Sequence, residues 1–221
     1  MIAIDGPAAS GKSTVGWILA KSLGYLLIDT GCMYRAVTLA ALKRQVSFED
    51  ESAISRVAKE IKIEILPPGS ADDGRMYTVN VDGVDVTWEL RSPDVDTNVS
   101  LVSSYKEVRS EMVRQQRLFA EIGRVVMVGR DIGTVVTPDA PLKLFITASA
   151  EERARRRWED RQAQGHANSF EIILEDVLRR DKIDSSRQIS PLRPADDAIV
   201  IDTTSRTPEE IVQHILALRV S

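Results

Sequence analysis

The sequence predicts a layered α/β fold around a five-stranded parallel sheet, and two alternating patterns carry this prediction. Short continuous apolar runs, typical of strands buried on both faces, occur at 2–5, 25–29, 125–128, 142–146 and 199–201. Segments with helical spacing of apolar residues or helical composition separate them, at 12–23, 33–43, 52–60, 105–122, 151–164, 170–180 and 208–218. Strands that alternate with helices in this way form parallel βαβ units, which give a three-layer fold.

Residues 61–88 have a different pattern, which predicts a small antiparallel sheet inserted into the main domain. Apolar and polar residues alternate over 61–65 and again over 77–86, as in strands with one buried face. Asp82-Gly83 interrupts the second run, and a two-residue Asp-Gly link between alternating segments is a strong hairpin signal. We therefore expect a core formed by 1–60 and 105–221 and an inserted subdomain at 61–104.

Composition and charge narrow the classes of function. The chain has 221 residues, of which 43% are hydrophobic and 28% charged, as is ordinary for a soluble domain with one core. Its net charge of -4 argues against nucleic acid as a partner, because proteins that bind the phosphate backbone are generally basic. The single cysteine, Cys32, cannot form an internal disulfide, and no signal peptide or membrane-length apolar stretch is visible. A cytoplasmic protein without a membrane partner is expected.

A phosphate-binding loop follows the first expected strand. The residues Gly6-Pro7-Ala8-Ala9-Ser10-Gly11-Lys12-Ser13 match G-x-x-x-x-G-K-[ST] at every position, and Thr14 continues into a helix. Glycines let the backbone wrap closely around phosphate oxygens, and the free amides of a helix N-terminus supply partial positive charge. This pattern is typical of P-loop NTPases. Lys12 is expected to reach the β- and γ-phosphates of a bound nucleotide, and the Ser13 hydroxyl to ligate Mg²⁺.

The loop alone leaves the reaction open, because GTPases, motor ATPases and small-molecule kinases share it. The sequence contains no N-K-x-D motif for guanine and no long strand that ends in an Asp-Glu pair. It has only two histidines, His166 and His214, so histidine catalysis is not favoured. Phosphoryl transfer depends more on positioning and charge neutralisation than on a base.

Arginines recur near the ends of the expected strands and on the helices that follow. They occur in Asp29-Thr30-Gly31 with Tyr34-Arg35, in Gly129-Arg130-Asp131, at Arg153, Arg155, Arg156 and Arg157, and in the set Arg180, Asp184 and Arg187. Guanidinium groups match phosphate oxygens bidentately. Ligands of parallel sheets bind beyond the carboxyl ends of the strands, where Gly6, Asp29 and Arg130 all fall. These residues are therefore expected to converge on one cleft.

On these residues the chain resembles bacterial cytidylate kinases, in the nucleoside monophosphate kinase group. The resemblance rests on Ile4-Asp5-Gly6-Pro7, Asp29-Thr30-Gly31 with Tyr34-Arg35, Gly129-Arg130-Asp131-Ile132-Gly133-Thr134-Val135-Val136, and Arg187 with Pro191-Leu192. It spans nearly the whole chain, and the segment 129–136 is far more specific than the phosphate loop. The insertion also resembles the extra small sheet of that family, where it enlarges the acceptor-binding domain.

The resemblance implies transfer of the γ-phosphoryl group of ATP to CMP, and to dCMP, with Mg²⁺ as the metal. The expected products are CDP, or dCDP, and ADP. It also implies a helical lid at about 150–168 that closes over ATP. The expected partners are small molecules alone, and no long exposed apolar helix demands a second copy, so a monomer is expected.

The same resemblance assigns roles to single residues. Arg35 and Arg130 are expected to hold the acceptor phosphate, and Arg187 to reach the transferring phosphoryl group. Cytosine is expected to be read by Ser100, Arg109 and Asp131, and the ribose to be held by Arg180 and Asp184. Arg153 and Arg157 are expected to contact ATP from the lid. The catalytic set is then Lys12, Arg130, Arg157 and Arg187.

Some roles stay open at this point. Thr30, expected to bind the acceptor, stands where the family pattern has serine, so the hydroxyl is kept and a methyl added. Arg109 facing solvent and Asp184 as a surface ion-pair partner are the alternatives to their binding roles. Asp5 could support the loop or serve the metal. Alternative functions are another small-molecule kinase, such as adenylate or shikimate kinase, and a non-catalytic ATP-binding regulator.

Overall fold

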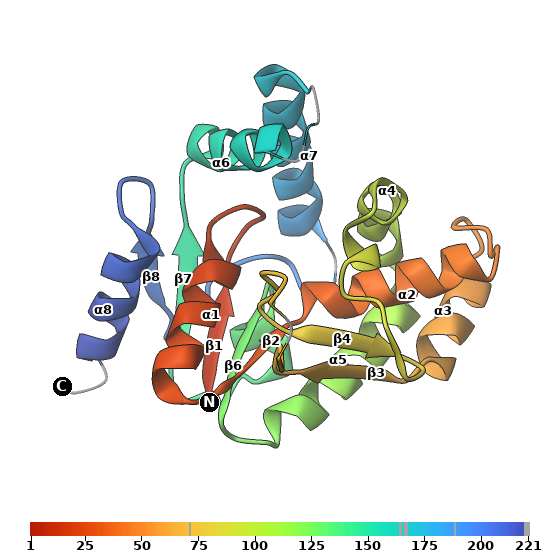
Figure 1. Cartoon of the computed structure of the whole chain (residues 1–221), viewed down its shortest axis with the longest axis horizontal. Coiled ribbons are helices and arrows are strands. Elements are labelled where there is room, and N and C mark those ends of the chain that lie inside the picture. The colour runs from red at the N-terminus through yellow and green to blue at the C-terminus, as the bar shows by residue number, and fades with distance from the viewer. Residues whose placement is uncertain (71, 164, 166–167, 188, 219–221) are drawn as a thin grey trace.

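The computed structural model describes residues 1–70, 72–163, 165, 168–187 and 189–218 (Figure 1). Its main sheet has five strands: β1 (Ile2–Asp5), β2 (Leu26–Asp29), β6 (Val125–Gly129), β7 (Lys143–Thr147) and β8 (Ile199–Asp202). They lie in the order β2-β6-β1-β7-β8, and every neighbouring pair is parallel. The predicted fold class is confirmed.

Helices cover both faces of this sheet. Helix α1 (Lys12–Leu23) packs against β1, β2 and β6, and α8 (Pro208–Leu218) lies beside it. The α1 residue Gly16 lies against Val126 and Val128 of β6. Successive strand residues point to opposite faces, so Val125 and Met127 lie on the face of the sheet away from α1. Both are fully buried, so this face is covered as well. Helix α5 (Lys106–Ala120) contacts β6 too.

The register of the central strands brings their carboxyl ends to one level. Asp5 at the end of β1 lies opposite Gly129 at the end of β6, and Asp29 at the end of β2 lies opposite Val128. The segments after these strands therefore start side by side. They are the phosphate loop, helix α2 (Gly31–Lys43) and a turn of π-helix, η2 (Ile132–Val136).

The predicted small sheet is also confirmed. Strands β3 (Ile63–Leu66), β4 (Thr78–Val81) and β5 (Val84–Asp85) pair antiparallel, after helix α3 (Glu51–Glu60). Asp82 and Gly83 link β4 and β5 with φ values of 51° and 81°, the left-handed conformations that a tight hairpin turn requires. The 3₁₀ turn η1 (Glu89–Arg91) and helix α4 (Pro93–Val102) complete this part of the chain.

The sequence patterns missed α4 and underestimated a second helix. Helix α4 has apolar residues at helical spacing, Val95, Val99 and Val102, but the residues between them include Asp94, Asp96 and Asn98, which favour helix weakly. Helix α7 spans Phe170–Ser186 rather than 170–180, because charged residues continue it beyond its apolar part. As a result Arg180 and Asp184 lie one turn apart on the same side of α7.

Helix α6 (Ala150–Ala163) packs against α7 around a small core of its own, formed by Ala154, Ile173 and Val177. The pair stands above the carboxyl edge of the main sheet in Figure 1. Trp158 donates from Nε1 to the carbonyl oxygen of Asn168 at 3.0 Å, which ties α6 to the residues just before α7. None of the described helices combines the length and apolar composition that crossing a bilayer needs.

The contact between α1 and β6 depends on the absence of a side chain at Gly16. A Cβ atom there would lie 2.6 Å from Val128 Cγ2 and 3.3 Å from Leu27 Cδ1. Gly16→Ala is expected to lower the free energy of unfolding by about 1–3 kcal/mol through overpacking, although alanine favours helix. Urea denaturation measures the change. The double variant Gly16→Ala/Val128→Ala is expected to lose less stability than the sum of its singles, and a stabilised Gly16→Ala would contradict this packing.

Candidate active site

The phosphate loop runs close against the strand β7. A Cβ atom on Gly6 would come within 2.0 Å of the carbonyl oxygen of Ile146, so only glycine fits there. Gly11 has φ 84°, a left-handed conformation, and lies directly before helix α1. The loop therefore leads directly into the N-terminus of α1, where free backbone amides and the helix dipole give a partial positive charge that attracts anions.

Lys12 is folded over its own loop. Its Nζ donates to the carbonyl oxygen of Pro7 at 2.8 Å, and the residue is only 8% exposed. Burial, with a further contribution from the nearby Arg130 cation, lowers the pKa of Lys12 to about 8. The ammonium group is thus poorly solvated, and an approaching phosphate would stabilise its charged form.

Ser13 and Asp29 bring hard oxygen atoms to the mouth of the loop. The Ser13 Oγ donates to Asp29 Oδ2 at 2.7 Å, and Asp29 Oδ1 accepts from the amide of Gly31 at 3.1 Å. Within the described ranges no three histidine, cysteine or acidic side chains gather as a metal cage. The oxygen pair fits Mg²⁺, which takes most of its ligands from phosphates and water in kinase sites.

Two adjoining cavities form one crevice at the carboxyl edge of the sheet. The larger, of about 860 Å³, is lined by loop residues 8–14 and by arginines of α6, among them Arg157. The two cavities share the lining residues Gly31, Arg35, Gly129, Arg130 and Arg180. The phosphate loop and all the predicted guanidinium groups except that of Arg153 therefore face this crevice.

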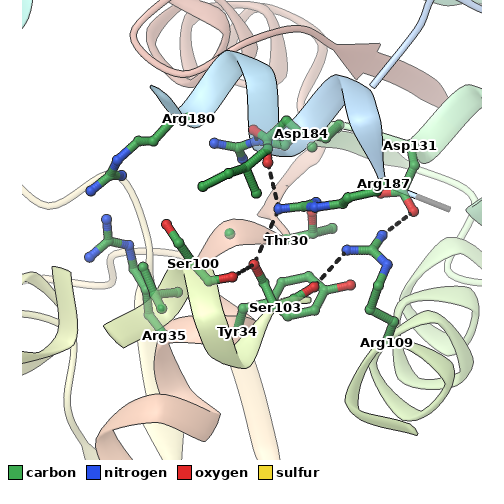
Figure 2. A pocket seen from close by; sticks show the side chains of 15 residues that line it. Thr30, Tyr34, Arg35, Ser100, Ser103, Arg109, Asp131, Arg180, Asp184 and Arg187 are labelled. Atoms are coloured by element: carbon green, nitrogen blue, oxygen red, sulfur yellow. Dashed lines mark hydrogen bonds and ion pairs between the residues drawn. The ribbon is translucent and has the colours of Figure 1, made fainter. Parts of the chain in front are cut away.

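All nine residues predicted to bind the acceptor line the smaller cavity: Thr30, Arg35, Ser100, Arg109, Arg130, Asp131, Arg180, Asp184 and Arg187. Figure 2 shows most of them with their side chains turned toward one another from several elements. Thr30 donates from Oγ1 to the carbonyl oxygen of Val128 at 2.9 Å, so its hydroxyl links β2 to β6. Its added methyl group is accommodated in a buried position.

Arg109 and Asp131 form a buried pair. Arg109 Nη2 lies 2.6 Å from Asp131 Oδ2, and the two residues are 3% and 5% exposed. The guanidinium also lies 5.5 Å from the ring centre of Tyr34 and donates to the carbonyl oxygen of Ser103 at 3.2 Å. The alternative of a solvent-facing Arg109 is therefore wrong.

Asp184 is also buried, at 4% exposure, and it holds two arginines. Its carboxylate accepts from Arg130 Nε and lies 2.5 Å from Arg187 Nη2. Arg187 Nη2 donates further to Ser103 Oγ at 3.3 Å (Figure 2). The alternative of a surface ion pair is therefore wrong for Asp184. It holds two guanidinium groups instead, that of Arg130 after β6 and that of Arg187 after α7.

The arginines of α6 differ in what they face. Arg153 is 4% exposed and lines neither cavity, because it lies 2.5 Å from Asp181 and donates to the carbonyl oxygen of Ala8 at 3.3 Å. In this conformation it ties α6 and α7 to the phosphate loop instead of facing the larger cavity. Arg157 does line the larger cavity, and burial, with nearby Arg180, lowers its pKa to about 10.

Asp5 supports the segment after β6. Its two carboxylate oxygens accept from the amides of Ile132 and Gly133 at 2.7 and 2.8 Å. Burial outweighs these bonds and raises the pKa of Asp5 to about 6. Asp5 therefore anchors the π-helical turn that presents Arg130 and Asp131, rather than the phosphate loop that follows it in sequence.

The sequence reasoning missed several lining residues. Val99, Ser103 and Ile183 line the smaller cavity, and Arg91 and Arg156 line the larger one. Arg156 was not distinguished from its neighbours on α6, although it alone bonds Thr203, through Nη1 to Oγ1 at 3.1 Å and Nη2 to the carbonyl oxygen at 2.6 Å. No pattern signals such contacts, because they join residues about fifty positions apart.

Comparisons with known proteins agree with this geometry. A family model described as "Cytidylate kinase" matches residues 2–220. A cytidylate kinase of Bacillus pumilus is 50% identical over 97% of this chain and 93% of its own length, and one of Roseiflexus castenholzii is 49% identical over 98% and 92%. A solved structure of an uncharacterized protein from Eubacterium ventriosum shares the fold alone, with a TM-score of 0.52 at 14% identity over 100% of this chain and 98% of its own. The phosphate loop, the buried Arg109–Asp131 pair and the cavity arginines lie in one crevice. The family match over nearly the whole length means that the chain belongs to the cytidylate kinase family.

Proposed function

We propose that this protein transfers the γ-phosphoryl group of ATP to CMP, and also to dCMP, giving ADP and the corresponding diphosphate. The observation that carries the proposal is the shared wall of the two cavities, where Arg35, Arg130 and Arg180 stand between the phosphate loop and the smaller cavity. The membership in the cytidylate kinase family supports the same reaction.

The loop holds the donor in this proposal. Its amides and the Lys12 ammonium bind the β- and γ-phosphates, and Lys12 exchanges the carbonyl oxygen of Pro7 for a phosphate oxygen. Mg²⁺, when bound, neutralises charge between these phosphates, and Ser13 with Asp29 would hold it. Arg157 approaches the same space from α6, whereas Arg153 keeps α6 and α7 tied to the loop.

The smaller cavity holds the acceptor. Arg35 and Arg130 bind its phosphate, and Arg187 reaches the phosphoryl group in transit. Asp131 accepts from the cytosine amine, while Arg109 and Ser100 donate to the ring acceptors. Asp184 and Arg180 hold the ribose. We assign residues 61–104 to acceptor binding and about 150–168 to a lid, since these segments carry Ser100 and Arg157; residues 71, 164, 166 and 167 of these ranges lie outside the described part of the chain.

The chemistry needs no protein nucleophile. An oxygen of the acceptor phosphate is already anionic at neutral pH and attacks the γ-phosphorus in line. The guanidinium groups of Arg130 and Arg187 neutralise charge that would otherwise keep the two phosphates apart. Closure of the lid excludes water, which suppresses hydrolysis of ATP. We also infer a monomer that acts in the cytosol, where its nucleotide substrates occur.

The acceptor panel is the first test. ADP formation is measured with CMP, dCMP, UMP, AMP and shikimate, and CMP and dCMP are expected to give the highest kcat/KM.

Lys12→Ala is expected to lower kcat by about a thousandfold, because loss of a transition-state cation has about this cost in related chemistry. Lys21→Ala, on the exposed face of the same helix, is the matched control. ATP binding without acceptor-dependent ADP release would instead identify a regulator.

The pH profile tests the state of Lys12. Burial lowers its pKa to about 8, so the free enzyme keeps the ammonium below that pH and loses it as the pH rises through it. We expect kcat/KM for ATP to fall above about pH 8, since this parameter reports ionisations of the free enzyme. Lys12→Arg keeps its charge throughout this range, so the alkaline limb is expected to vanish. The same limb in both enzymes would show that another group causes it.

Asp131→Asn tests how the base is read. The amide no longer accepts strongly from the cytosine amine and can donate to the carbonyl of uracil. We expect kcat/KM for CMP relative to UMP to fall by about 10- to 100-fold, as for loss of a hydrogen bond to a charged group. Acceptor kinetics measure the ratio, with the KM for ATP and the thermal midpoint as controls for folding. An unchanged ratio would remove Asp131 from base recognition.

A further inference from the structure

Asp96 lies where several site arginines meet. It belongs to α4, and its Oδ1 is 2.6 Å from Arg35 Nη1. Its Oδ2 is 3.5 Å from Arg161 Nη2 of α6, and its carbonyl oxygen accepts from Arg180 Nη2 of α7 at 3.4 Å. One residue of the insertion thus contacts arginines of three other helices. Nothing in the sequence patterns had singled it out.

The pair with Arg35 places a fixed negative charge at the proposed phosphate site. Arg35 lines both cavities and also donates from Nη1 to the carbonyl oxygen of Leu90 at 2.9 Å. Figure 2 shows its guanidinium group on the same side of the cavity as that of Arg180. Asp96 and Leu90 therefore both engage Nη1 of Arg35, so a ligand that binds this guanidinium group meets a carboxylate already beside it.

We propose that Asp96 is a positioning residue that sets the affinity for the acceptor, because its carboxylate competes with the acceptor phosphate for Arg35. The inference rests on the proposed function, in which Arg35 binds that phosphate. A phosphate dianion on Arg35 shares one guanidinium with a carboxylate of the same charge sign, which weakens binding. The competition also favours release of the diphosphate product.

Two features hold the Asp96 carboxylate in place beside Arg35. Arg161 stays within 3.5 Å of it as a second cation. Asp96 also lies in the first turn of α4, where the helix dipole favours a negative charge. The side chains of Asp96 and Arg35 are 23% and 26% exposed, so solvent screens their attraction and Arg35 can exchange partners at modest cost.

The test is the affinity of Asp96→Asn for CMP, measured by calorimetry and by steady-state kinetics. We expect the Kd and KM for CMP to fall about three- to fivefold, the size typical of a partly exposed ion pair, without a rise in kcat. The effect is expected to shrink at high salt, which screens charges. Binding of cytidine, which has no phosphate, is expected to stay unchanged. Asp94→Asn, an exposed carboxylate on the same helix, is the matched control.

The role of Arg35 is tested separately, so that the two proposals can fail independently. Arg35→Ala is expected to raise the KM for CMP, and adding Asp96→Asn to it is expected to give no further gain. If Arg35→Ala left the KM unchanged, the proposed phosphate site would be wrong. If Arg35→Ala raised it but Asp96→Asn left it unchanged or raised it as well, Asp96 would not compete with the acceptor.

Discussion

Mutual repulsion among the arginines at the carboxyl edge of the sheet is the constraint on which the rest of this structure depends. In the proposed reaction these cations neutralise two approaching phosphates, so they must stand close together before the phosphates arrive. Buried carboxylates make this possible, since Asp131 holds Arg109 and Asp184 holds Arg130 and Arg187. An isolated buried charge is costly, whereas a paired and hydrogen-bonded one is tolerated.

The scaffold serves this arrangement. Parallel strands end at one level, so the phosphate loop after β1 and the turn after β6 start side by side. Asp5 then fixes the π-helical turn through two backbone amides, which aims Arg130 and Asp131 into the crevice. The same carboxyl edge therefore carries both the phosphate loop and part of the proposed acceptor site. The insertion adds Ser100 and Asp96 from the other side through α4.

Much of this could be predicted from the sequence. The apolar runs gave the five strands because parallel strands are buried on both faces, and the Asp82-Gly83 turn located the small sheet. The motif after β1 and the arginines after β2 and β6 predicted one cleft, and the cavities bring those residues together. Helix α4 was hidden by weak helix formers such as Asp94, Asp96 and Asn98, although its valines have helical spacing, and the end of α7 was hidden by its charged last turns.

The partners of the charged residues could not be predicted either. Arg153 and Arg157 lie one turn apart on α6, yet one ties the loop to α7 and the other lines the nucleotide space. Asp96 pairs with Arg35, 61 positions earlier in the chain, by a contact that only the tertiary fold creates. Composition and spacing identify the residue types that a site needs. The tertiary packing determines which arginine or aspartate, among several in the sequence, lies in the site.

The most direct test of one continuous crevice is the binding of a bisubstrate compound, in which adenosine and cytidine are joined through a chain of phosphates. We expect it to bind one molecule per chain, to exclude ATP and CMP together, and to bind far more tightly than either, because linked ligands gain effective concentration. A compound that displaced only one of the two substrates, while the other still bound at its normal affinity, would contradict the account.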